Sequence, residues 1–518
     1  MFHIKSSPFI TTIGFLALST SFSSFANIAQ KDIVTMHIPQ LRAALDNKKL
    51  TSEEIVQAYL DEIKQKNKSI NAVITINPKA LEQARAWDAH HKKAPAGHMS
   101  VGGIPFMAKD NYNTKGILTT GGSLALADSV PKTNAFVIQK LLDDGAILLA
   151  KTNMSELASS FGRPGYSSVG GLTLNPSNLL RNSSGSSSGS ASAVAAHLAP
   201  FALGTDTSGS IRGPAAVTGT VGLRPTLGLT SRSGIIPLSL SFDTAGVITS
   251  NVTDQAIVVD VMKGEDPKDA ATKFAHRPSH SFYQDLKSAS FKGKTIGVLT
   301  NFREGNKEVN QRIDAAVAKM KKAGAHIVPI TMPKSFDNLY GDVMAPVGME
   351  EFKPQFNAYL ANLAKGEPHT MAEFMKILAK KTDNGKKVIN PGRYKGLVKN
   401  FHSPSSSPKY IQVLTRKIPA VTQVINDRFK ESGLDALVFA TTSCPASPAY
   451  GKKDLTYVCH MKSGFLATRM ASISGYPEVT VPAGRITANM PVGISFMGLR
   501  NEDSDVLQLG YAFEKLNK

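Results

Sequence analysis

The sequence predicts an α/β protein: a single large domain with a mixed, mostly internal β-sheet covered by helices. Three observations predict this class. Strand-like and helix-like segments alternate along the chain, several strand segments are continuous apolar runs typical of internal strands, and 42% hydrophobic with 19% charged residues is a globular composition. The chain has 518 residues, enough for one large domain or for two to three ordinary ones.

The first half of the chain begins with a predicted helical region over residues 33–65. Thr51 and Glu54 form a capping box there, and apolar side chains from Ile55 to Ile63 share one helix face. Further elements follow in order: a strand in 70–77, a helix in ALEQARAWDAHH (80–91), a strand in VGGIPFMAKDN (101–111), a helix in FVIQKLLDDG (136–145) and a buried strand in AILLAKTN (146–153).

The second half continues with strands predicted in 293–300, 434–442 and 491–499. Residues 310–330 indicate a helix, a glycine stop and a strand. Residues 331–430 are the least regular part, and within them FHSPSSSPK (401–409) is expected to be an exposed loop because of its proline and serine content.

The N-terminus is predicted to be a signal peptide over residues 1–26. Lys5 precedes an apolar run that ends at the small-x-small pattern Ser24-Phe25-Ala26. Its strongly apolar centre, 10–18, is too short to span a membrane comfortably, and no later run reaches that length. We therefore expect a periplasmic or secreted protein, residues 27–518, with no stable membrane insertion after cleavage.

The formal net charge is +19, which would suit nucleic acid, anionic lipid or an acidic wall polymer. The basic stretches, such as KMKK (319–322), are short, scattered and not interleaved with aromatic residues. This distribution favours a solvated basic surface and argues against a nucleic-acid partner.

Two cysteines occur, Cys444 and Cys459. In an exported protein they could form a disulfide, but sequence does not give the Cβ geometry, so the bond stays open. Two cysteines cannot close a zinc site, and His90, His91 and His98 lie in a polar loop without acidic or cysteine partners. We expect surface histidines and no metal.

Two glycine-serine stretches, 182–190 and 204–213, could be flexible linkers or could contain catalytic residues. Gly185 to Gly189 matches the G-x-S-x-G elbow of α/β-hydrolases, with Ser187 as nucleophile, but the preceding NPSNLLRNSS is polar where that motif needs a buried strand. Ser406 to Lys409 matches S-x-x-K, which belongs at the start of a helix, whereas Pro408 is expected in a loop. Neither pattern is favoured.

Both stretches lead into Ala/Val-rich segments, which flexible linkers do not do. Glycines at such junctions let the backbone turn tightly and direct N–H groups at a ligand, and a serine nucleophile needs a base. Lys109 is a candidate base, because the apolar IPFMA before it can desolvate the amine and lower its pKa from about 10.

Together these motifs resemble the amidase signature family. GIPFMAKDN (103–111) resembles its lysine motif, NSSGSSSGSASAVA (182–195) its glycine-serine signature and GTDTSGSIRGPAA (204–216) its nucleophile motif. TTGGSLAL (119–126), GYPEVTVPAG (475–484) and MPVGISFMG (490–498) also fit. The resemblance places the family-like core at about 70–262 and 434–515, and a variable, substrate-shaping region at about 331–430.

The resemblance implies the family's fold and a Ser–cis-Ser–Lys triad, with Ser210 as nucleophile, Ser186 on a cis peptide bond and Lys109 as base. It also implies an oxyanion hole made by the backbone N–H groups of the nucleophile loop: Thr207, Ser208, Gly209 and Ser210. Three further residues are implied as supports: Ser187, Asp206 and Arg212. No cofactor or metal is implied.

Ser188 and Ser208 stand where glycine is usual in the family. Since the hole uses main-chain groups, Ser208 should not abolish it, but it limits the backbone to angles open to serine. The serine-rich GSSSGS and MEEFKPQFNAYL (349–360) resemble peptide-amidase members. The implied function is therefore hydrolysis of peptide or amino-acid amides through an acyl-enzyme, with release of ammonia or an amine.

Other functions remain open at this point. The glutamine-hydrolysing subunit of an amidotransferase would work in the cytosol, which the export signal disfavours. An esterase or aryl amidase of the same family, and a catalytically silent envelope-binding protein, are further alternatives. The preferred acyl group and the oligomeric state are not indicated by the sequence.

Overall fold

Eleven strands form one mixed sheet at the centre of the molecule, which confirms the predicted fold class. The strand order is β1-β3-β2-β8-β10-β9-β14-β15-β13-β11-β12. The strands are β1 Val73–Ile76, β2 Pro105–Lys109, β3 Ile147–Thr152, β8 Phe201–Asp206, β9 Val221–Arg224, β10 Thr244–Thr249, β11 Thr295–Leu299, β12 His326–Ile330, β13 Ala436–Ala440, β14 Glu478–Ile486 and β15 Met490–Met497. Two small hairpins, β4 Tyr166–Ser167 with β5 Gly171–Leu172 and β6 Leu174–Asn175 with β7 Asn178–Asn182, lie outside this sheet.

The computed structural model describes residues 1–3, 28–90 and 99–517. The predicted signal segment lies outside these ranges from residue 4 onward, and so do His91 and His98. His90 is described and exposed. Within the described ranges, no helix combines the length and apolar character needed to cross a membrane.

Parallel pairing occurs in two blocks of the sheet. Strand β2 runs parallel to both β3 and β8, and β11 runs parallel to β12 and β13. The remaining pairs are antiparallel. The central strands β2, β3, β8, β9 and β10 are buried along their whole length, as the continuous apolar runs predict.

Helices cover both faces of the sheet, and alternation along β14 shows this directly. A Cβ on Gly510, in the C-terminal helix, would meet Val479 and Val481. A Cβ on Gly493, in the neighbouring strand, would meet Thr480 and Ala216, which belongs to the helix Arg212–Thr218 on the other face. The helices are α1 Gln30–Ile33, α2 Ile38–Asp46, α3 Ser52–Ile70, α4 Ala80–His90, α5 Phe136–Asp143, α6 Ser188–Ala195, α7 Arg212–Thr218, α8 Val252–Met262, α9 Phe282–Asp285, α10 Lys307–Lys322, α16 Arg469–Ser474 and α17 Asp503–Leu516.

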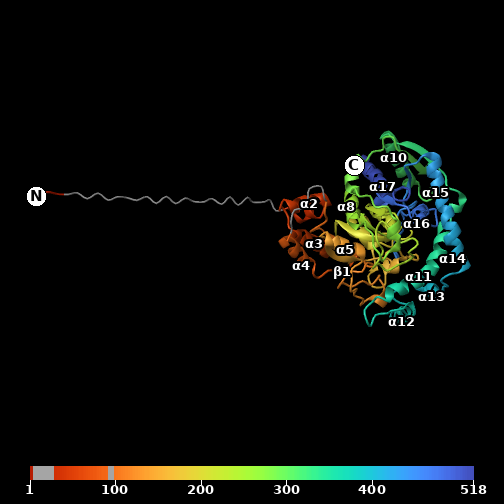
Figure 1. Cartoon of the computed structure of the whole chain (residues 1–518), viewed down its shortest axis with the longest axis horizontal. Coiled ribbons are helices and arrows are strands. Elements are labelled where there is room, and N and C mark those ends of the chain that lie inside the picture. The colour runs from red at the N-terminus through yellow and green to blue at the C-terminus, as the bar shows by residue number, and fades with distance from the viewer. Residues whose placement is uncertain (4–27, 91–98, 518) are drawn as a thin grey trace.

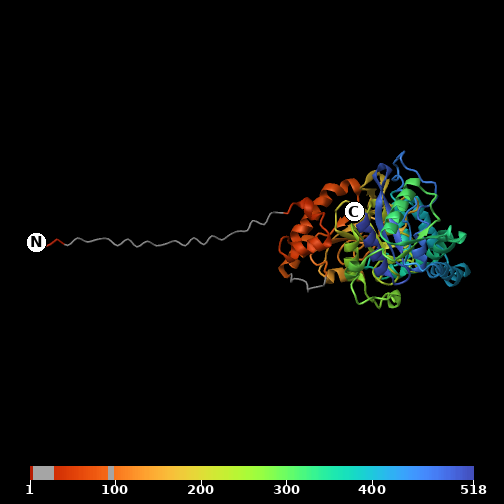
Figure 2. The ribbon, with the colours of Figure 1, turned by 90° about the horizontal axis from the view of Figure 1, so that it is seen from above.

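The helical region predicted over 33–65 is divided into α1, α2 and α3, and the capping box of Thr51 and Glu54 starts α3 as predicted. Helices α2 to α4 form the end of the molecule nearest the N-terminus, and the helices of residues 345–432 lie on the opposite side (Figure 1). The perpendicular view shows the same separation (Figure 2).

The segment 331–430 is more regular than the sequence suggests. It contains α11 Ala345–Leu360, α12 Met371–Thr382, α13 Pro391–His402, α14 Pro408–Gln412 and α15 Ile418–Ser432. Only residues 403–407 of the predicted loop 401–409 are irregular. Ser407 caps α14, where its hydroxyl accepts from the N–H of Tyr410. The S-x-x-K segment therefore does start a helix, contrary to the expected loop, but it does not line the main cavity described below.

Candidate active site

Lys109 is the last residue of β2 and lies next to the end of β8. The two strands are parallel, with Ala108 paired to Leu203, so their carboxyl ends meet at one edge of the sheet. This pairing brings Lys109 beside Thr205 although 96 positions separate them in the chain. The sheet, not a loop, positions the amine.

Three hydroxyl groups surround Nζ of Lys109. Ser186 Oγ and Thr205 Oγ1 each lie 2.7 Å away, and Ser187 Oγ lies 3.1 Å away. Lys109 has no exposed surface. Burial lowers the pKa of Lys109 to about 7, against the opposing effect of the negative charges of Asp206 and Asp243. The amine therefore reaches its neutral, basic form at ordinary pH.

Ser186 follows a cis peptide bond, between Gly185 and Ser186, as the family resemblance implies. The carbonyl of Ser186 accepts a hydrogen bond from the N–H of Ser155 over 3.1 Å, which holds this turn in place. A Cβ on Gly185 would lie 2.4 Å from Ser155 Oγ, so any side chain there would have to displace Ser155. The tight turn delivers the Ser186 hydroxyl to the lysine.

Ser187 joins the turn to both neighbouring segments. Its Oγ donates to the carbonyl of Thr205 and accepts from the N–H of Thr205, each over 3.2 Å. Its backbone N–H donates to the carbonyl of Ser210 over 3.1 Å, so the two serine segments lie directly against each other. Ser187 has no exposed surface, and the following residue begins α6. These contacts fit a supporting residue.

The loop that carries Ser210 is folded around the carboxylate of Asp206. That carboxylate accepts from the N–H groups of Gly209 and Ile211, over 2.9 and 3.0 Å, and from Nε and Nη2 of Arg212. Burial alone would raise the pKa of Asp206, but Arg212 and then Arg224 outweigh it and lower the pKa. Asp206 therefore stays charged and fixes the loop.

Arg212 connects the same loop to the strand that begins at Glu478 and to the segment 468–472. Its Nη1 donates to the carboxylate of Glu478 at the start of β14 and to the carbonyl of Thr468, and its Nη2 donates to Ser472 of α16. All of these contacts are buried, and Arg212 itself has no exposed surface. Removing one partner of such a network leaves an uncompensated buried charge. The contacts of Arg212 are structural.

The predicted oxyanion donors are not equivalent in the structure. The N–H of Gly209 is already engaged by Asp206, whereas the N–H groups of Thr207, Ser208 and Ser210 have no acceptor among the described residues. Gly209 takes a φ of 112°, and Ser208 is not among the described residues with positive φ. Glycine is thus needed at Gly209, and serine is accommodated at Ser208.

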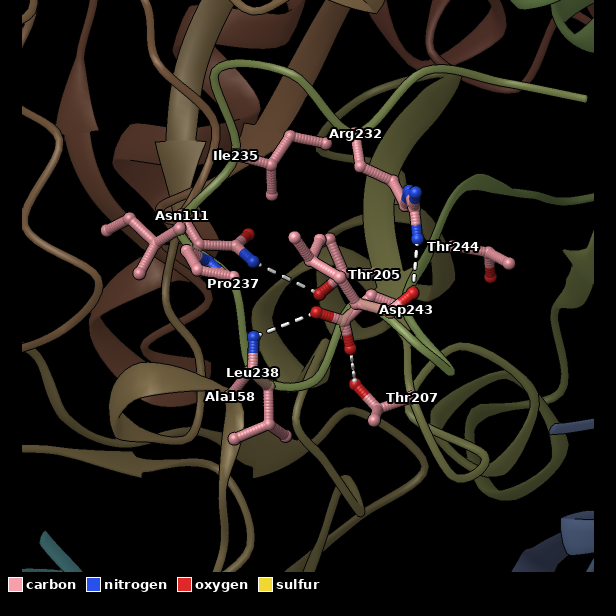
Figure 3. A pocket seen from close by; sticks show the side chains of 12 residues that line it. Asn111, Ala158, Thr205, Thr207, Arg232, Ile235, Pro237, Leu238, Asp243 and Thr244 are labelled. Carbon is pink, nitrogen blue, oxygen red and sulfur yellow. Dashed lines mark hydrogen bonds between the residues drawn. The ribbon is translucent and has the colours of Figure 1, made fainter. Parts of the chain in front are cut away.

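Three residues next to the nucleophile loop were given no role from sequence: Asn111, Thr205 and Asp243. Figure 3 shows them together. Asn111 donates through Nδ2 to Thr205 Oγ1 over 3.1 Å, and Thr207 donates through Oγ1 to Asp243 over 2.5 Å. The second oxygen of Asp243 accepts from the N–H groups of Leu238 and Ser239. The small space that these side chains enclose is about 10 Å³, too small for a substrate group.

A second, much larger cavity, of about 750 Å³, also borders the nucleophile loop. Thr207, Ser208, Gly209 and Ser210 line it together with Gly185. Ser210 is 9% exposed and Ser186 only 1%, so the nucleophile candidate reaches the cavity while Ser186 lies behind it. The volume is that of an ordinary small-molecule site.

Two segments form the far walls of this cavity. The region 331–430 contributes residues from α11 and α13, including Met349, Arg393 and Asn400. The second wall runs from Cys444 to Arg469. Cys444 and Cys459, both in that wall, are joined by a disulfide with Cα atoms 5.5 Å apart.

Ser187 does not occupy the position that the G-x-S-x-G elbow would give it. It is buried at the N-terminus of α6, its Oγ contacts Lys109 and Thr205, and it does not line the large cavity. An elbow nucleophile must be exposed to substrate. Ser187 is therefore no candidate nucleophile.

The chain is similar to known proteins over most of its length. A family model described as Amidase matches residues 54–507. A probable amidase of Arabidopsis thaliana is 34% identical over 493 residues, covering 92% of this chain and 89% of the relative. A glutamyl-tRNA(Gln) amidotransferase subunit of Thermoanaerobacter pseudethanolicus is 31% identical over 497 residues, covering 94% of this chain and 97% of the relative.

Among solved structures, the native peptide amidase of Stenotrophomonas maltophilia aligns with a TM-score of 0.83 and 32% identity, covering 93% of this chain and 97% of that one. The same values hold for the peptide amidase in complex with the competitive inhibitor chymostatin. The matched family model spans most of the chain, and these neighbours share its mixed sheet and helical layers. The chain belongs to the amidase signature family and is a hydrolase that acts on carbon–nitrogen bonds.

Proposed function

We propose that the protein hydrolyses amides of peptides or amino acids by a Ser210–Ser186–Lys109 relay and an acyl-enzyme. The observation that carries this proposal is the buried amine of Lys109, with a pKa of about 7, lying 2.7 Å from Ser186 Oγ. A neutral amine with a hydroxyl neighbour can accept a proton, which a charged ammonium cannot.

The relay works in two half-reactions. Lys109 takes the proton of Ser186 while Ser186 takes that of Ser210, and Ser210 Oγ attacks the carbonyl carbon of the amide. Ser186 then gives its proton to the leaving nitrogen while the Lys109 ammonium returns a proton to Ser186, the C–N bond breaks, and ammonia or an amine departs. Water attacks the acyl-enzyme with the same proton path reversed, which releases the carboxylic acid and restores Ser210.

The negative charge that develops on the carbonyl oxygen needs hydrogen-bond donors. We assign this role to the N–H groups of Thr207, Ser208 and Ser210, which line the cavity and have no acceptor among the described residues. Loss of one such donor costs about 3 kcal/mol of transition-state stabilisation. Asp206 and Arg212 hold the loop in the shape that presents these groups.

The choice of peptide or amino-acid amides is supported by the likeness to the Stenotrophomonas peptide amidase, at a TM-score of 0.83. The amidotransferase alternative is supported by 31% identity to the Thermoanaerobacter amidotransferase protein, while the solved amidotransferase structure of Thermotoga maritima aligns with a lower TM-score of 0.69. Esters and aryl amides are further substrates that the same relay could cleave.

The test is a panel of peptide amides, aryl amides, fatty amides, esters and glutamine, with ammonia or acid release measured. We expect peptide amides to have the highest kcat/KM and Ser210→Ala to abolish turnover while circular dichroism stays unchanged. Exclusive hydrolysis of esters would contradict the peptide-amide assignment. Exclusive hydrolysis of glutamine would favour the amidotransferase reaction, and retained activity in Ser210→Ala would contradict the relay itself.

We also propose export to the periplasm or the medium, with cleavage near Ala26. The apolar segment after Lys5 supports this, and so does the disulfide between Cys444 and Cys459, since such bonds persist in oxidising compartments. N-terminal sequencing of the mature protein should start near residue 27. An intact Met1 would contradict export with cleavage.

A further inference from the structure

The large cavity is lined by cations and by no carboxylate. Arg393, Lys462 and Arg469 line it, and none of the described residues around it is Asp or Glu. The whole chain carries a formal charge of +19, so the surrounding field has the same sign. A cavity of one charge sign concentrates ligands of the opposite sign. The question is which cation is free to bind such a ligand.

Arg393 makes most of its contacts with other residues of the protein. It is 1% exposed, lies over the rings of Phe161 and Phe352, and donates to the carbonyl of Leu157 over 3.2 Å. Burial lowers the pKa of Arg393 to about 10, and the nearby carboxyl of Glu156 opposes this shift. Arg393 is therefore packed within the fold, with a backbone acceptor and a carboxyl in its surroundings. Its buried Nε, like that of Arg469, has no acceptor among the described residues, so what sets Arg393 apart is its nearly complete burial and the nearby carboxyl.

Arg469 differs from Arg393 in its charged surroundings. Burial lowers the pKa of Arg469, and the opposing effect comes from Tyr340 alone, whereas for Arg393 it comes first from the carboxyl of Glu156. Asp and Glu are absent from the described residues that line the cavity. Its Nη2 donates to Ser463 Oγ over 3.1 Å, and its buried Nε has no acceptor. A guanidinium that is largely desolvated and incompletely hydrogen-bonded is an incomplete site for a planar anion.

The guanidinium of Arg469 is also held in place. It lies over the ring of Tyr340, 5.0 Å from the centroid, and Tyr340 lines the same cavity. A stacked guanidinium presents its donors in a fixed plane, which suits the two oxygens of a carboxylate. The loss of conformational entropy on binding is correspondingly small.

Arg469 lies close to the nucleophile loop. The carbonyl of the preceding residue, Thr468, accepts a hydrogen bond from Arg212. Thr468 Oγ1 would be 2.9 Å from a Cβ on Gly209. Ser210 and Arg469 line one cavity. A substrate whose amide carbon is at Ser210 therefore shares this cavity with the guanidinium.

We propose that Arg469 makes the cavity selective for peptide amides that also carry a carboxylate, with the carboxylate bound by the guanidinium. This inference rests on the proposed amide hydrolysis and names its substrate class: acidic peptide amides. Lys462, which is exposed at the same cavity, adds to the attraction without fixing a geometry.

The competing interpretation is that Arg469 is structural and merely joins Tyr340 to Ser463. The two interpretations differ in what a substitution does. Loss of a structural link lowers kcat/KM for every substrate to the same degree, whereas loss of an anion site changes the ratio between charged and neutral substrates. The ratio is therefore the decisive quantity.

The experiment uses three peptide amides that differ only in the residue before the amidated one: Glu, Met or Lys. With the mature wild-type protein we expect kcat/KM in the order Glu, Met, Lys, with Glu at least about tenfold above Met. Arg469→Gln should bring the Glu-to-Met ratio to about one, and Arg469→Lys should keep part of it. Arg485→Gln, a cation outside this cavity, should leave the ratio and the rates unchanged.

A wild-type preference for Met over Glu would overturn the proposal, and so would an equal loss for all three substrates in Arg469→Gln. Binding is measured separately by calorimetry with the Ser210→Ala variant and the Glu peptide amide. If no peptide amide is hydrolysed but the Glu peptide still binds in an Arg469-dependent manner, the proposed reaction fails while the anion site stands. Absence of such binding would overturn the anion site.

Discussion

Nζ of Lys109 lies 2.7 Å from Oγ1 of Thr205, at the carboxyl ends of two parallel strands. Thr205 Oγ1 also accepts from Nδ2 of Asn111, so it acts as a fixed acceptor for the lysine. A neutral amine has two N–H groups and one lone pair. With one N–H directed at Thr205, the other N–H and the lone pair remain for the hydroxyls of Ser186 and Ser187.

Lys109 and Ser186 are expected to act as one unit. Lys109→Met and Ser186→Ala should each lower kcat/KM by about 10³-fold or more, and the double variant should be no worse than the poorer single variant. Steady-state hydrolysis of a peptide amide measures this. Ser188→Ala is the matched control, because Ser188 is a buried serine of the same stretch whose Oγ has no hydrogen-bond partner among the described residues. Additive losses would contradict a shared relay.

The activity should depend on pH through Lys109. Its active form is neutral and its pKa is about 7, so kcat/KM should fall as pH drops through about 7. The negative charge of Asp243 raises that pKa, so Asp243→Asn should move the acid limb to lower pH. pH–rate profiles of both proteins test this. Asp266→Asn removes a carboxylate that is not among those raising the pKa of Lys109, so it should leave the limb in place.

Gly209 is expected to tolerate no side chain. An alanine there would have to adopt a φ of 112° and place Cβ 2.9 Å from Thr468 Oγ1. Gly209→Ala should lower kcat more than about tenfold and cost about 1–3 kcal/mol of stability. Gly116→Ala shares the positive φ but meets open space, so it should lose stability and keep kcat. Kinetics and urea unfolding compare the two, and equal kcat losses would count against a specific effect on the loop.

The disulfide is expected to stabilise both the fold and one cavity wall. It closes a loop with a sequence separation of 15, for which chain entropy gives about 3 kcal/mol. The double variant Cys444→Ser and Cys459→Ser should lose about that free energy of unfolding and show a raised KM, because both residues line the cavity. Wild-type protein treated with a reductant should show the same loss of unfolding free energy and the same raised KM as the double variant. An unchanged KM would mean that the wall keeps its shape without the bond.

The strand–helix order and the motif-bearing segments could be predicted because their signals are local. A continuous apolar run such as 146–153 and the capping box at Thr51 each depend on neighbouring residues. Residues 331–430 are less regular in sequence than in the structure, and for 401–409 the expected loop rests on proline and serine content. The prolines within the helices of this region lie mostly in the first helical turn, where no N–H is needed, and only Pro354 lies inside a helix.

The second layer of the site could not be predicted in the same way. Asn111 and Asp243 contact the site through partners 94 and 36 positions away in the chain. Asn111 ends the lysine motif 103–111, but nothing in that motif indicates its hydrogen bond to Thr205. The hydrogen bond from the Gly209 N–H to Asp206 could not be predicted either. Whether a side chain accepts from a particular main-chain N–H depends on the folded shape of the loop. Thr205 had one local signal, its place directly before Asp206.

Neither wall of the large cavity contributes a strand to the central sheet, since β12 ends at Ile330, β13 spans Ala436–Ala440 and β14 begins at Glu478. The bond-breaking groups and the groups that meet the rest of the substrate are therefore encoded in separable stretches of the gene. Segments 331–430 and 444–463 could be exchanged or randomised while Thr468, whose carbonyl accepts from Arg212, and the strand that carries Lys109 are left intact. Such libraries would sample new acyl and amine preferences on an unaltered hydrolytic centre.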